Sequence, residues 1–324
     1  MSDIKDYLAK DFLTKPELKP TRDGFGTGLV KVGHLDENVV VICADLTDST
    51  RSAAFAKEFP ERFIEVGVAE QNMMGIAAGM ALSGKVPFIS SYAVFNPGRN
   101  WDQLRVSVAY SKANVKIAGA HAGISVGPDG ATHQALEDMA IVRVLPNMTV
   151  IAPCDWVECE KATIAVGKMY GPAYVRFGRE NVATVTTDRT PFEIGKAEVY
   201  REGKDVTVIA CGIMVFEALK AAEEISKDGI ELEVINCHTI KPLDVKTIVE
   251  SAKKTGKVVT AEEHQINGAL GSAVAEALSE NCPVPMARVG VLDTFGESGK
   301  PDELMDAYLL RSKDIIRKVK SLIK

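Results

Sequence analysis

The densest group of polar side chains lies in a glycine-rich segment, residues 119–134, with the sequence GAHAGISVGPDGATHQ. His121, Asp129 and His133 can exchange protons or bind hydroxyl groups. The four glycines let the backbone turn tightly and approach a ligand closely. The segment is therefore a candidate wall of a sugar-binding site. An ordinary capped loop is the alternative, and a zinc site is less favoured because glycine-rich loops hold metals poorly.

A second group occurs at residues 63–75, FIEVGVAEQNMMG, where a short strand leads into an apolar helix. Glu70 stands at the start of that helix, where the helix dipole favours a carboxylate. An ordinary first-turn acid is one interpretation. The other is a buried carboxyl group, which holds a proton more readily and can share it with a ligand. Glu65 is less informative, because alternation along the strand could place it in solvent.

Three further groups follow predicted strands. Asp45 and Ser49 come after a buried strand and could bind a ligand or cap the next helix. Tyr92 and Phe95 could stack on a planar ring or pack in the core. The segment 176–180, RFGRE, ends another strand with a cation that could bind phosphate or form a surface ion pair. Because open α/β sheets bind ligands at the carboxyl ends of their strands, all these groups could form one site.

Short β-branched runs alternate with longer amphipathic or small-residue segments, which predicts an α/β fold of two domains, each with a mainly parallel sheet flanked by helices. In the first domain we expect strands at 39–44, 86–90, 115–119, 149–152 and 173–177, and helices at 70–82, 100–111 and 156–169. In the second we expect strands at 206–210, 231–235, 257–261 and 286–289, and helices at 215–226, 245–254, 268–280 and 302–310. The segment 181–193 lacks a helical pattern and is the expected linker, which gives domains at 20–185 and 195–324.

Composition and charge exclude several classes of protein. The net charge of −6 over 324 residues argues against nucleic acid or an anionic membrane as the main partner. No apolar stretch approaches the roughly 20 residues that cross a bilayer. The six cysteines form no C-x-x-C pair, so we expect reduced, mostly buried thiols in a cytoplasmic protein, without cysteine-bound metal. The segment 313–324 alternates cations with apolar residues and is expected to be a packed terminal helix rather than a membrane-surface helix.

Together, these residues resemble the pyrimidine-binding and C-terminal domains of the transketolase family. The resemblance covers about residues 20–310, and its most specific parts are GVAEQN at 67–72 and GPDGATHQ at 127–134. It implies an enzyme subunit that uses thiamine diphosphate to move a two-carbon ketol unit between ketose and aldose phosphates, as in the pentose phosphate pathway.

The resemblance also implies the residues that contact the cofactor. Glu70 matches the acid that hydrogen-bonds N1′ of the thiamine aminopyrimidine. The shared proton favours the imino form, whose N4′ removes the proton from C2 of the thiazolium, so that this carbon can attack a ketose carbonyl. Phe95 matches the ring that stacks on the pyrimidine, Tyr92 lies nearby, and Asp45 matches a neighbour of the cofactor.

A third set of matches concerns the substrate. Glu70, His121 and His133 are the expected catalytic residues. No metal ligand is expected in this chain. The positions that match contacts with sugar hydroxyls or with the sugar-phosphate end are Arg22, Ser49, His121, Asp129, His133 and Arg179.

One part of the family pattern is absent. Complete members begin with a diphosphate-binding domain whose G-D-G and later Asn hold Mg²⁺ and the diphosphate, and this sequence has no G-D-G. The roughly twenty residues before Arg22 are far below the roughly 50 that a domain needs. A fragment is one explanation. We expect instead the C-terminal subunit of a split enzyme. An N-terminal subunit would then hold most of the Mg²⁺ and diphosphate contacts, in an α2β2 heterotetramer.

Related functions stay open at this point. Deoxyxylulose-phosphate synthase has a similar loop, one residue shorter, but usually has arginine at the place of His121. The β subunit of 2-oxoacid dehydrogenases usually has a different loop. Many transketolases have G-x-R-E-H where this chain has Ala69-Glu70-Gln71, which keeps the acid but leaves the sugar open. A non-catalytic assembly subunit is another class. In the second domain, His264 lies at a predicted strand end and could be structural or an interface residue.

Overall fold

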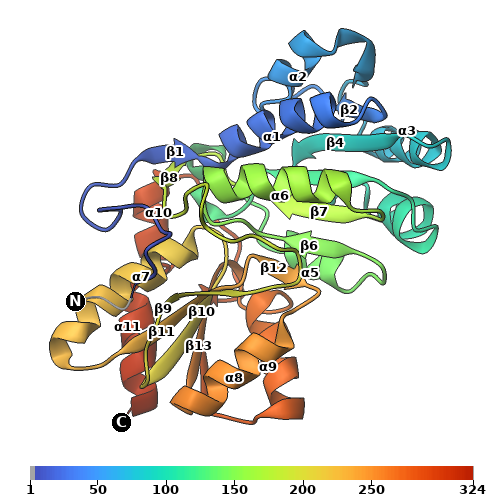
Figure 1. Ribbon diagram of the computed structural model, residues 1–324. Helices are drawn as coiled ribbons and strands as arrows, with labels where there is room; N and C mark the ends of the chain where they lie inside the picture. Colours follow the sequence, from blue (N-terminus) through green and yellow to red (C-terminus); the bar gives the residue numbers. More distant parts are fainter. Residues whose placement is uncertain (1–3, 324) are drawn as a thin grey trace.

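Two mainly parallel sheets, one in each half of the chain, organise the structure (Figure 1). The computed structural model describes residues 4–323. The larger sheet is parallel except at one edge, where its first strand in spatial order runs antiparallel. Its seven strands, in that order, are β12 (Thr239–Lys241), β6 (Thr149–Ile151), β7 (Ala173–Arg176), β5 (Lys116–Ala120), β4 (Val86–Tyr92), β2 (Val39–Cys43) and β3 (Phe63–Glu65).

The smaller sheet has five strands and is also parallel except at one edge. Its order is β14 (Met286–Val291), β13 (Val258–Gln265), β10 (Val206–Ala210), β11 (Leu232–Asn236) and the antiparallel β9 (Glu198–Arg201). A separate antiparallel pair joins β1 (Leu18–Pro20) to β8 (Asn181–Ala183). The predicted α/β class, with mainly parallel sheets flanked by helices, is confirmed.

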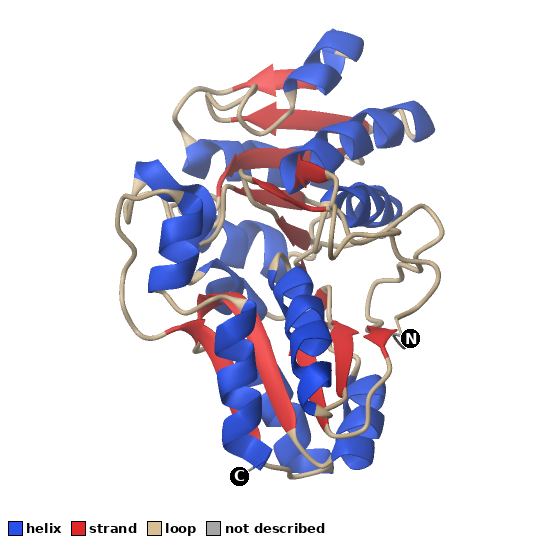
Figure 2. Ribbon diagram, turned by 90° about the vertical axis from the view of Figure 1, so that its left-hand side faces the viewer, coloured by secondary structure: helices blue, strands red, loops and turns tan. Residues whose placement is uncertain are grey.

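Helices lie on both sides of each sheet (Figure 2). The first half contributes α1 (Thr21–Leu35), α2 (Ala53–Glu58), α3 (Glu70–Leu82), α4 (Trp101–Gln103), α5 (Asp138–Arg143) and α6 (Trp156–Lys168). The second half contributes α7 (Met214–Ile225), α8 (Val245–Thr255), α9 (Leu270–Asn281), α10 (Pro301–Ala307) and α11 (Ser312–Ile323). Shorter turns include η1 (Pro60–Arg62), the π-helix η2 (Leu104–Tyr110) and the 3-10 segments η3 (Ile124–Asp129) and η4 (Ser226–Asp228).

Successive side chains of the larger sheet pack on opposite layers, as the two-residue period of a strand requires. Val41 and Phe88 belong to the apolar core beneath α1 and α6. Their neighbours Ile42 and Ile89 pack on the other side, in the core that contains Met73 of α3. Both faces of the central strands are buried, so the strands are rigid supports for the loops at their ends.

The two halves of the chain share apolar packing and one sheet edge. The core below α3 also contains Ile209 and Ile235 of the smaller sheet. In addition, β12 comes from the second half but pairs with β6 of the larger sheet, with Thr239 opposite Ile151. These contacts fix the C-terminal half against the loops of the first half.

Most predicted elements occur close to their expected bounds, with three informative differences. The predicted helix 100–111 divides into α4 and the π-helix η2. The predicted strand 257–261 extends to Gln265 as β13, so His264 lies at the end of this strand, as expected. The helix α1 lies in a segment for which no element was predicted. The expected linker 181–193 contains no helix, although its first residues form β8.

The terminal segment and the cysteines follow expectation. In α11, Ile315 and Val319 are buried and the helix packs on α7. Within residues 4–323, no helix combines the length and apolar character needed to span a membrane. All six cysteines are free thiols; Cys282 is half-buried and the others are buried.

Candidate functional site

The candidate site forms where neighbouring parallel strands of the larger sheet end. The register places Cys43 opposite Ser90, Tyr92 opposite Ala120, and Gly119 opposite Arg176. The loops after β2, β4, β5 and β7 therefore begin at the same edge. These loops hold nearly all of the side chains that the sequence singled out.

Glu70 is a buried carboxylate at the first residue of α3, with a side chain only 2% exposed. Its Oε2 accepts a hydrogen bond of 2.7 Å from Nη1 of Arg99, and its Oε1 lies 3.5 Å from Oγ of Ser91. The amide of Asn100 donates to the Glu70 carbonyl at 3.1 Å. The carboxylate is thus held in one place at the edge of the sheet. Arg99 is 29 residues away in the chain, and the sequence predicted no role for it.

Four rings gather beside this carboxylate. Tyr92 and Phe95 are nearly parallel, with ring centroids 6.3 Å apart and planes at 12°. The ring of His121 stacks on Tyr92 with centroids 4.1 Å apart. The ring of His133 is nearly perpendicular to that of Phe95, with centroids 5.4 Å apart. The guanidinium of Arg99 lies 4.6 Å from the Phe95 ring and links the rings to Glu70. A flat ligand could stack on this surface and reach the carboxylate.

His121 is buried and neutral. Burial, followed by the positive charge of Arg22, lowers the pKa of His121 to about 3. Its Nε2 lies 3.5 Å from Nη1 of Arg22, which also donates to the Ser49 carbonyl at 3.1 Å. Because an arginine can only donate, Nε2 accepts and the hydrogen resides on Nδ1. Among residues 4–323, this buried Nδ1 has no hydrogen-bonding partner.

The far side of the site contains a second cation. Arg179 approaches Asp129 at 3.3 Å and Glu180 at 3.6 Å, and all three side chains are about one-third exposed. Arg22 and Arg179 are cations at this end that could bind an anionic group of a ligand.

Arg176 is buried in an ion pair, whereas the sequence left open that a cation of this segment binds phosphate. Its Nε donates to Asp138 at 2.9 Å, and the hydroxyl of Tyr174 donates to the same carboxylate oxygen at 2.7 Å. Both members of the ion pair are buried. The guanidinium is therefore a structural group beneath the loop, and Arg179 is the exposed cation at this strand end.

Asp45 lies two residues after the end of β2, and the carboxylate of Glu65 positions it. Glu65 is exposed, as alternation allowed, but its carboxylate accepts from the backbone of Asp45 (2.7 Å) and Gly67 (2.9 Å) and from the hydroxyl of Thr47 (2.9 Å). Asp45 and Gly67 both have positive φ. Glu65 thus fixes two turns next to the candidate site. The preference of acidic side chains for binding nearby turn N–H groups was the available signal.

Comparisons with known proteins identify the family of the chain. The family model described as "Transketolase, pyrimidine binding domain" matches residues 18–184, and the one described as "Transketolase, C-terminal domain" matches residues 195–315. The chain belongs to the transketolase family.

Individual members of the transketolase family cover nearly the whole chain. The "Putative transketolase C-terminal section" of Methanocaldococcus jannaschii is 46% identical over 93% of this chain and 95% of its own length. The "6-deoxy-6-sulfo-D-fructose transketolase subunit SqwH" of Clostridium sp. (strain MSTE9) is 44% identical over 96% of each chain. A solved structure titled "Split gene transketolase, inactive beta4 tetramer" has a TM-score of 0.88 at 47% identity, covering 94% of this chain and 98% of that one.

The residues present fit the aminopyrimidine part of thiamine diphosphate, the cofactor that the transketolase family implies. A buried carboxylate next to parallel aromatic rings suits an aminopyrimidine, because the acid can bind a ring nitrogen while the rings stack. In the described part of the chain, no group of three or more His, Cys, Asp or Glu side chains is placed to hold a metal ion.

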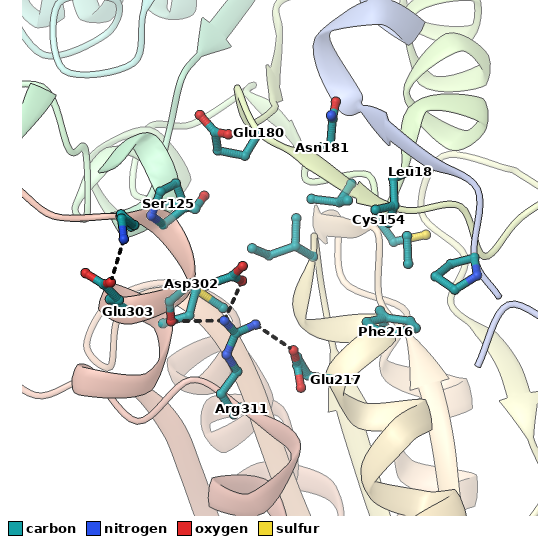
Figure 3. A pocket seen from close by; sticks show the side chains of 17 residues that line it. Leu18, Ser125, Cys154, Glu180, Asn181, Phe216, Glu217, Asp302, Glu303 and Arg311 are labelled. Atoms are coloured by element: carbon teal, nitrogen blue, oxygen red, sulfur yellow. Dashed lines mark hydrogen bonds and ion pairs between the residues drawn. The ribbon is translucent and has the colours of Figure 1, made fainter. Parts of the chain in front are cut away.

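A separate cavity of 610 Å³ lies between the two halves, beside β1, β8, α7 and α10 (Figure 3). Its wall is partly apolar, with Leu18 and Phe216, and Arg311 points there toward Glu217 and Asp302. The lining includes Ser125 and Glu180 from the loops of the candidate site, but none of the expected site residues. The cavity therefore adjoins the site without forming part of it.

Proposed function

We propose that the chain is the C-terminal subunit of a split transketolase that moves a two-carbon ketol unit between ketose and aldose phosphates. Its pyrimidine-binding domain would comprise residues 20–185 and its C-terminal-like domain residues 195–324. The observation that carries the proposal is the buried Glu70 carboxylate beside the rings of Tyr92 and Phe95. Free thiols support a cytoplasmic location.

When bound, thiamine diphosphate supplies the nucleophilic carbon and the electron sink of ketol transfer. Glu70 would hold the proton that passes between its carboxyl oxygen and the pyrimidine nitrogen. Phe95 and Tyr92 would orient the pyrimidine by stacking. Asp45 would lie beside the cofactor, on the turn that Glu65 fixes.

The remaining residues would bind the sugar. The neutral ring of His121 would donate from Nδ1 to a sugar oxygen, since this nitrogen has no other partner among the described residues. His133 and Asp129 lie on the same loop and would bind hydroxyl groups. Arg22, with Ser49 beside it, and Arg179 would bind the phosphate by charge-assisted hydrogen bonds.

The outer face of α3 supports a second subunit at this site. Gly75 and Gly79 are exposed on this face, and a Cβ atom added to either would meet no atom within 4 Å. Val68 and Leu82, at the two ends of the face, are 69% and 70% exposed. An apolar helix with a bare outer face is usually covered by a partner. We propose that the N-terminal subunit covers it, contributes the diphosphate-binding domain and most of the Mg²⁺ contacts, and forms an α2β2 complex with this chain.

The test is ketol transfer by the complex reconstituted with the N-terminal subunit, thiamine diphosphate and Mg²⁺. Glu70→Gln keeps the shape of the side chain but cannot pass the proton, so kcat should fall by about 10²–10⁴-fold. Glu158→Gln is the matched control, because Glu158 is also a buried acid in the first turn of a helix but lies outside the site. Wild-type kcat in the Glu70 variant, or no ketol transfer by the wild-type complex, would overturn the proposal.

A further inference from the structure

The C-terminal half reaches the glycine-rich loop 121–134 through the carboxylate of Glu263. This residue lies in β13 of the smaller sheet and is 4% exposed. Its Oε1 accepts a hydrogen bond of 2.7 Å from the backbone N–H of Ser125, 138 residues away in the chain. Its own carbonyl accepts from Nη2 of Arg176 at 2.8 Å. Glu263 thus joins the smaller sheet both to the loop and to the ion pair beneath it.

The carboxylate of Glu263 packs directly against the loop backbone. Gly123 has φ of +93°, and a Cβ atom at this position would lie 2.3 Å from two atoms of the Glu263 carboxyl group. Glycine is needed here for its conformation and for the space that it leaves. Any larger residue would push the loop away from the smaller sheet.

This contact lies between the two ligand-binding parts of the loop. His121 precedes Gly123 by two residues, and Asp129 follows Ser125 by four. His121 also has positive φ, at +52°, so its ring direction depends on a backbone conformation that is uncommon for a non-glycine residue. The hydrogen bond at Ser125 fixes the turn that follows this strained residue.

The far end of the loop has a second attachment to the C-terminal half. Nε2 of Gln134 donates to the carbonyl of Glu297 at 2.9 Å and to the carbonyl of Ile124 at 3.1 Å. The loop is therefore held at two points by a domain that supplies none of the expected site residues. Burial raises the pKa of Glu263, with Arg176 acting in the opposite direction. Burying a carboxyl group costs desolvation free energy. Holding the loop in place therefore explains Glu263 better than a contribution to stability does.

We propose that Glu263 is a positioning residue for sugar binding, which acts by holding the loop so that His121 and Asp129 face the substrate. This inference rests on the proposed function, because it assigns the loop to the sugar. It gives the C-terminal half a part in substrate recognition.

The test compares two neighbouring acids. Glu262 is equally buried, but its carboxylate accepts from the backbone of Leu270 (2.9 Å) and Gly271 (2.8 Å), at the start of α9 and away from the loop. In the reconstituted complex, Glu263→Ala should lower kcat/KM for the sugar phosphates by about 10²-fold, as expected when reacting groups shift by about 1 Å. The Kd for thiamine diphosphate should change less than kcat/KM, since Glu70, Tyr92 and Phe95 lie outside the loop 121–134. Glu263→Gln keeps an acceptor oxygen and should restore part of the loss.

Glu262→Ala should leave kcat/KM unchanged, although both alanine variants lose stability. Equal kinetic losses in the two alanine variants, or wild-type kcat/KM in Glu263→Ala, would overturn the proposal. If Glu263→Ala does not fold, Gly123→Ala, which pushes the loop away from Glu263, should lower kcat/KM in its place, and wild-type kcat/KM in that variant would overturn the proposal.

A second readout separates this inference from the proposed function. In hydrogen–deuterium exchange of the full chain, peptides from residues 121–134 should exchange faster in Glu263→Ala than in the wild type. The same peptides should exchange at the wild-type rate in Glu262→Ala. If the wild-type complex lacked ketol transfer, the proposed function would fail while exchange still reported on the loop. Unchanged loop exchange in Glu263→Ala would refute the positioning role.

Discussion

The two arginines at and after the end of β7 allow a structural cation to be distinguished from one that we propose to bind phosphate. Arg176 and Arg179 are three residues apart, yet Arg176 is buried against Asp138 while the side chain of Arg179 is 35% exposed. Replacing each by Met removes the charge and keeps much of the length. The two variants should fail in different assays.

Arg176→Met should lower the free energy of unfolding. In the wild type, the buried Asp138 accepts from the side chains of Arg176 and Tyr174; in the variant, the hydroxyl of Tyr174 remains as its donor. Burial alone lowers the pKa of Arg176, but the carboxylate of Asp138 raises it above its ordinary value, which marks a strong attraction. Removing one partner of a buried ion pair costs about 3–5 kcal/mol. With a urea dependence of about 3 kcal/mol per M, the midpoint should fall by about 1–2 M.

Arg179→Met should behave in the opposite way. Its ion pairs with Asp129 and Glu180 are solvent-exposed, so their loss should cost at most about 1 kcal/mol of stability. Losing a charge-assisted hydrogen bond to phosphate, worth about 1.5–3 kcal/mol, should raise KM for sugar phosphates by roughly 10–100-fold. The assays are urea unfolding of the chain, followed by circular dichroism, and steady-state kinetics of the reconstituted complex.

A double variant provides the internal control. Arg176→Met with Asp138→Leu removes both charges, and such apolar replacements of buried pairs are often neutral, so much of the lost stability should return. An unchanged urea midpoint in Arg176→Met, or a large stability loss in Arg179→Met, would refute the assignment of roles.

Two further predictions concern the residues around the rings. Because the pKa of His121 lies near 3, below the ordinary value of about 6.5, its ring signals in NMR should not titrate between pH 5 and 8. The unfolded chain takes up this proton near pH 6.5 and the folded chain does not, so the folded state becomes less stable as the pH falls from 6.5 toward 3. Above pH 7, His121 adds nothing to the pH dependence of stability. A titration midpoint near 6.5 would contradict the buried neutral ring. Glu65→Ala removes three acceptor contacts and should cost about 1–3 kcal/mol of stability and raise the Kd of the complex for thiamine diphosphate, with faster amide exchange at Asp45 and Gly67. Wild-type exchange at both amides would argue against the role of Glu65.

Local pattern was enough to predict much of this protein. The strand at β10 and the helix α3 occur at their predicted bounds, because each is a continuous run with one period and clear ends. Glu70 was recognisable for the same reason, as a lone acid that opens an apolar helix. The glycine-rich loop was also visible, since its residue types are unusual over a short span.

Helix α1 could not be predicted from local preference, because glycine is a poor helix former and α1 contains four glycines. The structure supplies the reason for two of them. A Cβ atom at Gly24 would lie 1.9 Å from the Trp156 carbonyl, and one at Gly28 would lie 2.6 Å from Cβ of Thr163. Glycine allows α1 to pack closely on α6, and this tertiary contact outweighs the propensity.

The sequence by itself determined the fold class, the family and the side chains at the strand ends, since periodicity and motif are local properties of the chain. Only the tertiary structure decided which of these side chains meet. It paired Arg99 with Glu70 and buried Arg176 against Asp138, 38 residues away. It also brought Glu263 from the other half of the chain to the glycine-rich loop. A strand pattern specifies which face a residue takes, but its partners across loops and domains depend on how the sheets pack.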